Sequence, residues 1–79
     1  MAWRVVEHDD RRWNVTIAAE RRANSPQWNL VFSFRPADLG QHSFWATYPL
    51  SSTSRSALFA QAAQLSDDAI AAFLAEHLQ

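Results

Sequence analysis

The segment WNLVFSFR, residues 28–35, sets the architecture that we expect for this chain. Large apolar side chains occupy every second position of the segment, at Trp28, Leu30, Phe32 and Phe34. Because neighbouring side chains of a β-strand point to opposite faces of a sheet, this spacing predicts a strand with one buried face. Pro26 and Pro36 stand at its limits, where a residue without a backbone N–H does not interrupt a ladder of hydrogen bonds.

The same period of two recurs in three further segments, residues 2–8, 12–20 and 43–50. Their apolar faces consist of Trp3 and Val5, then Trp13, Val15, Ile17 and Ala19, and then Phe44, Ala46, Tyr48 and Leu50. Consecutive half-buried strands joined by short polar connections are typical of an antiparallel sheet in chain order. The four segments therefore predict a four-stranded meander.

The register between strands follows from the apolar faces, since a slip of one residue turns a whole face outward. For the second and third segments we expect Val15 opposite Phe32. For the third and fourth we expect Phe32 opposite Ala46. These pairings place the odd residues of the second segment and the even residues of the third and fourth on one buried face.

The first hairpin is harder to assign. A two-residue turn at Asp9-Asp10 would set Val6 against Trp13 and leave Trp3 and Val5 on the other face. We therefore expect a longer loop, such as Asp9-Asp10-Arg11, or a β-bulge, with Val5 opposite Val15.

The pattern changes after Pro49, which we expect to close the fourth strand. Residues 51–54 are polar, and the Ala-rich sequence that follows has apolar residues at helical spacing. Thr53 or Ser54 is the expected N-cap of a first helix, because a short side-chain oxygen there accepts a hydrogen bond from a free backbone N–H. Ser66 is the expected N-cap of a second helix, in which Asp67 and Asp68 suit the positive end of the helix dipole.

Together these segments predict an α+β fold of one domain, residues 1–79. A four-stranded antiparallel meander sheet over residues 1–50 carries two C-terminal helices, within residues 54–78, packed on one face (ββββαα), which gives two layers. A chain of this length buries only enough apolar surface to offset roughly its conformational entropy, so self-association would help to stabilise it.

Composition narrows the functional classes. The chain has no Cys, so a disulfide framework and a thiolate metal site are excluded. All seven basic residues are Arg, but the formal net charge is −1, whereas domains that bind nucleic acid mainly through phosphates carry a strong positive excess. Apolar runs are too short for a spanning helix or a signal peptide, so we expect a soluble, cytoplasmic protein.

The sheet face opposite the helices is the candidate functional surface. With the expected register, this face holds two sets of residues. An interaction set consists of Trp45, Val6, Val31 and Arg4, and a set that could bind an anion or nucleic acid consists of His8, Arg12, Arg35 and Ser43. Apolar residues on an uncovered face indicate an interface, and clustered arginines need an anion or a carboxylate nearby.

Motifs for catalysis and for cofactors are missing: the sequence has no Gly-rich phosphate loop, G-x-S-x-G or H-E-x-x-H. His8, Asp9, Asp10 and His42 resemble an acid-rich turn more than a metal site, and adjacent His42 and Ser43 would point to opposite faces of a strand. We expect no enzyme activity, cofactor or metal.

The leading hypothesis is a small non-catalytic protein-interaction module that self-associates through the outer sheet face or an edge strand. A single-stranded nucleic-acid binder, with Trp45 stacking a base, is the alternative. A small anionic-ligand binder or enzyme near His8, Arg12 and Arg35 is the second alternative. No membrane partner is expected.

Overall fold

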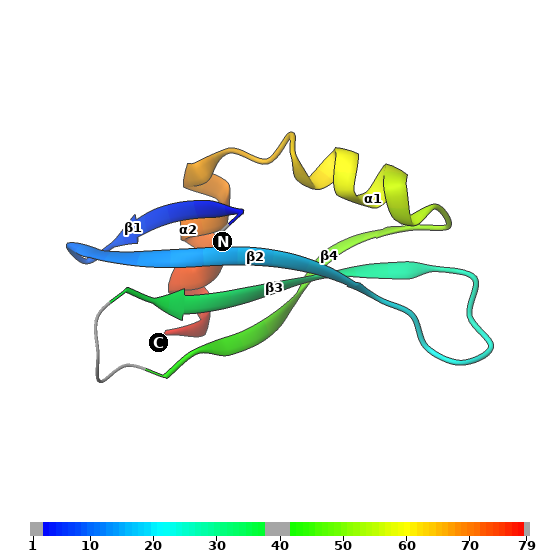
Figure 1. The fold of residues 1–79 in the computed structure, drawn as a ribbon, viewed down its shortest axis with the longest axis horizontal. Helices are drawn as coiled ribbons and strands as arrows, with labels where there is room; N and C mark the ends of the chain where they lie inside the picture. The colour runs from blue at the N-terminus through cyan, green and yellow to red at the C-terminus, as the bar shows by residue number, and fades with distance from the viewer. Residues whose placement is uncertain (1–2, 38–41, 79) are drawn as a thin grey trace.

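The computed structural model describes residues 3–37 and 42–78, and it confirms the expected fold class. Its elements in chain order are β1 (Arg4–His8), β2 (Arg11–Glu20), β3 (Trp28–Pro36), β4 (Phe44–Ser52), α1 (Arg55–Ala62) and α2 (Asp67–His77). The strands form one antiparallel sheet in the order β1-β2-β3-β4, and the two helices pack against it (Figure 1).

The first hairpin differs from the expected one. β1 and β2 are joined by a two-residue turn, Asp9-Asp10, in which both residues have positive φ, 52° and 62°. Two successive residues in the left-handed region make the turn type whose twist matches that of the flanking strands. Val6 therefore lies opposite Trp13 and is buried, whereas Val5 is exposed, so the predicted pairing of Val5 with Val15 is wrong.

The other two registers agree with the expected buried face. Val15 pairs with Phe34 instead of Phe32, a shift of two residues that leaves the same side chains in the core. Phe32 pairs with Ala46, as predicted. β4 does not stop at Pro49 but continues to Ser52, because a register shift at Asn29/Leu30 accommodates the proline on this edge strand.

Both helix starts are confirmed. Ser54 caps α1, and its side chain accepts a hydrogen bond from the N–H of Ala57 over 3.2 Å. Ser66 caps α2 in the same way, accepting from the N–H of Ala69 over 3.1 Å. The two hydroxyls thus satisfy backbone donors that have no partner inside their helices.

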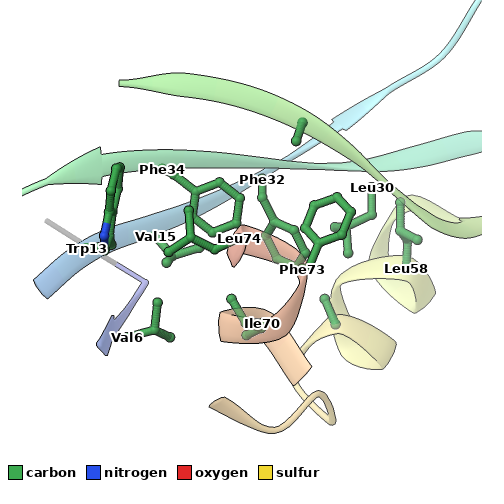
Figure 2. Close-up of a cluster of buried hydrophobic side chains, with 12 residues drawn as sticks. Val6, Trp13, Val15, Leu30, Phe32, Phe34, Leu58, Ile70, Phe73 and Leu74 are labelled. Carbon is green, nitrogen blue, oxygen red and sulfur yellow. The ribbon is translucent and has the colours of Figure 1, made fainter. Parts of the chain in front are cut away.

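The core lies between the sheet and the helices (Figure 2). Aromatic rings from both layers meet there: the ring of Phe73 in α2 lies 5.7 Å from Phe32 and 4.9 Å from Tyr48, measured between centroids. Trp3 precedes β1, and its ring stacks on Phe32 at 6.2 Å, so Trp3 contributes to the core although Val5 does not.

Candidate functional site

We call the side of the sheet turned away from α1 and α2 the outer face. Side chains alternate along each strand, so the register assigns the residues of this face. They are Val5 and Glu7 of β1, Arg12, Asn14, Thr16, Ala18 and Glu20 of β2, Asn29, Val31, Ser33 and Arg35 of β3, and Trp45, Thr47 and Ser51 of β4. Among the elements that the structure describes, no helix packs on this face.

Trp45 is the most prominent residue of the outer face. Its side chain is 65 % exposed, in a row across the sheet that also holds Ser33 and Thr16. Val31 lies on the same face in the next row, between Ala18 and Thr47, and its neighbours leave it only 7 % exposed. The structure therefore places both residues on the predicted face, with Trp45 as the projecting group.

Two other members of the predicted interaction set lie elsewhere. Val6 belongs to the hydrophobic core, because the two-residue turn reverses the parity of β1. Arg4 also faces the helices, where its guanidinium donates hydrogen bonds to the carbonyl oxygens of Leu65 and Ala63 and lies 3.3 Å from Asp67 Oδ1. Placing Val6 and Arg4 on the outer face was wrong, and Arg4 instead ties the segment between α1 and α2 to the sheet.

The same reversal puts Val5 on the outer face, 49 % exposed. Val5 was not predicted on this face because the first loop was expected to be longer. The signal that could have revealed it is the pair Asp9-Asp10, since Asp tolerates positive φ and two such residues suit a tight hairpin.

The predicted anion set is not brought together. His8 lies on the helix side of the sheet, where its Nε2 is 3.4 Å from Asp9 Oδ2. Arg12 Nε is 3.8 Å from Glu7 Oε1, so this guanidinium already has a carboxylate beside it. Arg35 lies opposite Asn14 instead of Arg12, and exposed Ser43 precedes β4.

His8 contributes instead to a hollow of about 330 Å³ at the turn end of the molecule, lined also by Asp9, Arg11, Trp13 and Leu78. This hollow does not include Arg12 or Arg35. Within residues 3–37 and 42–78, no group of three or more His, Asp or Glu side chains is placed to hold a metal ion.

No family model, curated protein or solved structure matches this chain. Neither α1 nor α2, the helices of the described residues, has the length and apolar character needed to span a bilayer.

Proposed function

We propose that the protein is a small non-catalytic interaction module that self-associates by packing its outer face against the outer face of a second copy. The observation that carries the proposal is the 65 % exposure of Trp45 on a sheet face that no described helix covers. Tryptophan is enriched in the energetically dominant centres of protein interfaces, where its large side chain is removed from water. We also propose that the protein is cytoplasmic, as expected from its sequence.

The surroundings of Trp45 favour a protein partner. The nearest outer-face positions on β2, β3 and β4 are Thr16, Ser33 and Thr47, which are short and uncharged. Removing such side chains from water costs less than removing charged ones, and a weakly polar centre with a charged rim is typical of interfaces. The charged residues of the outer face lie towards the two ends of the strands, as this arrangement requires.

The position of Trp45 favours a second copy as the partner. Its row crosses β2 at Thr16, near the middle of that strand, and so lies about halfway between the two ends of the face. A two-fold axis that crosses the strands at right angles in the plane of the interface reverses their direction. When it passes along this row it keeps β4 over β4 and brings the two Trp45 side chains together.

The size of the face is also appropriate. The four strands hold 5, 10, 9 and 9 residues, and at about 3.4 Å per residue and 4.8 Å between strands they give a projected area of roughly 540 Å². A standard interface buries about 800 Å² of accessible surface on each partner, and accessible surface exceeds projected area on a face with side chains. Sheet-on-sheet packing of the whole outer face therefore approaches the size of a standard interface.

Sedimentation velocity from micromolar to millimolar concentration tests the proposal. The wild-type chain should form a two-chain species, and Trp45→Ala should weaken the dimer about tenfold or more, as expected for an interface centre. Leu78→Ala is the matched control, because Leu78 is also a large exposed apolar residue, at 41 %, but lies beyond α2. This control should dimerise like the wild type.

A chain that stays monomeric throughout, or a dimer weakened by Leu78→Ala and not by Trp45→Ala, would overturn the proposal. The nucleic-acid alternative predicts a different result: a monomer that binds single-stranded oligonucleotides with an affinity that falls steeply with salt and is lost in Trp45→Ala.

A further inference from the structure

A second surface lies at the end of the sheet where β3 and α1 begin. Trp28, the first residue of β3, lies close to two arginines from separate parts of the chain. The Cζ atom of Arg21, just after β2, is 5.1 Å from the centroid of the Trp28 ring, and that of Arg55, the first residue of α1, is 5.6 Å from it. Arg55 also lies 5.6 Å from the centroid of Phe59.

These arginines are not neutralised by a carboxylate. Among the described residues, neither Arg21 nor Arg55 has an ion-pair partner within 4.0 Å, and the first turn of α1 contains no acid. Arg22 adds a third exposed positive charge beside Arg21, while Glu20 is the acid nearest to them in the sequence. A chain with a formal net charge of −1 thus concentrates positive charge at one end.

Stacking leaves these guanidiniums able to bind a ligand. A guanidinium over an aromatic ring uses its flat face for the cation–π contact, and its N–H groups, which lie in its plane, stay available as donors. Packing against Trp28 also limits the side-chain motion that binding would otherwise have to suppress. Forked N–H donors match the oxygen atoms of a phosphate group.

A hollow beside Arg55 has room for a ligand. It has a volume of about 450 Å³ and is lined by Ser54, Arg55, Ser56 and Phe59. The Ser54 hydroxyl already accepts the capping hydrogen bond from Ala57, but the Ser56 hydroxyl, 3.2 Å from that of Ser54, can rotate to donate to an anion. Phe59 supplies an apolar wall next to this polar group.

We propose that Arg21 and Arg55 form a binding site for a phosphate monoester whose organic group packs against Phe59. Arg55, which lines the hollow, donates to the dianionic phosphate, and Arg21 adds a second positive charge beside the same tryptophan. A carboxylate carries only one negative charge and gains less from these two positive charges, so the site selects phosphate. The site lies at the far end of the sheet from the Asp9-Asp10 turn and does not depend on self-association through the outer face.

Titration with phenyl phosphate, followed by amide and indole N–H chemical shifts in NMR spectra, tests this proposal. We expect saturable shifts at the Trp28 indole and at residues 54–59. Arg55→Gln should weaken binding about tenfold or more, the loss expected when a charge-assisted hydrogen bond is removed, and Arg21→Gln should weaken it less, because it removes only a nearby charge. Arg55→Lys should also weaken binding, because an ammonium keeps the charge but loses the planar fork.

Arg35→Gln is the matched control, since it removes an exposed arginine from another part of the sheet and should leave the affinity unchanged. Benzoate should bind more weakly than phenyl phosphate, because it carries one negative charge where the phosphate carries nearly two. Trp45→Ala should keep the phosphate affinity of the wild type even when it abolishes the dimer, so the two proposals fail separately.

Two results would overturn the site. The first is the absence of saturable shifts, or shifts that Arg35→Gln reduces as much as Arg55→Gln does. The second is binding of a thymidine oligonucleotide without binding of phenyl phosphate, which would indicate a surface for nucleic acid instead. Circular dichroism of each variant verifies that the exposed substitutions leave the fold intact.

Discussion

Val6 and Trp13 lie directly opposite each other in the β1–β2 hairpin, and both side chains are buried. The two-residue turn at Asp9-Asp10 fixes this pairing and thereby decides which residues of β1 reach the core. Because the side chains alternate, the same turn sends Val5 to the outer face. One local feature of the backbone therefore sets both the packing of the first strand and part of the proposed interface.

The alternation of side chains along β1 predicts that replacing two neighbouring valines by alanine changes the free energy of unfolding unequally. Val6→Ala should lower the free energy of unfolding by about 2 kcal/mol, because it removes buried methyl groups and leaves a cavity. Val5→Ala should change the stability of the monomer by less than about 0.5 kcal/mol, since its side chain is half exposed. Urea denaturation at low protein concentration measures both values, and equal losses would contradict the register of β1.

The turn itself predicts a stabilising substitution. Asp10 has a φ of 62°, a conformation that glycine adopts without the steric cost that other residues pay. Asp10→Gly should therefore raise the free energy of unfolding by about 0.5 to 1 kcal/mol. Asp68→Gly, in the first turn of α2, should lower it by a similar amount, because glycine weakens a helix. A loss of stability in Asp10→Gly would argue against the two-residue turn.

The contacts of Arg4 predict that its hydrogen bonds contribute more to the free energy of unfolding than its ion pair does. Arg4→Met removes the donors to the carbonyl oxygens of Leu65 and Ala63 and should cost about 2 kcal/mol of unfolding free energy. Asp67→Asn removes only a carboxylate that is 68 % exposed and should cost less than about 1 kcal/mol. Thermal denaturation of both variants makes the comparison, and a larger effect of Asp67→Asn would show that the ion pair dominates.

Self-association through the outer face predicts a melting temperature that depends on protein concentration. Because a partner that binds only the folded state stabilises it by mass action, the wild-type midpoint should rise as the chain becomes more concentrated. Trp45→Ala should reduce this dependence while leaving the midpoint at the lowest concentration nearly unchanged, since Trp45 is exposed in the monomer. Calorimetry over a concentration series measures the effect. A concentration-independent midpoint in the wild type would contradict the dimer.

Much of the fold could be predicted from the sequence, because strand alternation and helix capping are local signals. Ser54 and Ser66 were identified as caps from residue type and spacing alone, and the pairing of Phe32 with Ala46 followed from matching apolar faces. The pairing of Val15 was wrong by two residues because the apolar pattern decides which face is buried but does not distinguish registers of equal parity.

The candidate site was harder to predict, since it depends on parity and on contacts between distant residues. Trp45 was placed correctly on the outer face because β3 and β4 had the right register. Arg4 and Val6 were placed on the wrong face because the loop of the first hairpin was expected to be longer than two residues. The contact of Arg21 and Arg55 with Trp28 joins three separate parts of the chain, and no spacing in the sequence indicates it.

The hydrogen bonds of Arg4 connect β1 to residues 59 to 63 positions later in the chain. β1 therefore cannot make all of its contacts until the segment around Leu65 and α2 have been synthesised. During synthesis on the ribosome, α2 must leave the exit tunnel before this core can close. The growing chain therefore emerges with the part of its sheet that α2 covers unprotected, and this part stays exposed until α2 has left the tunnel.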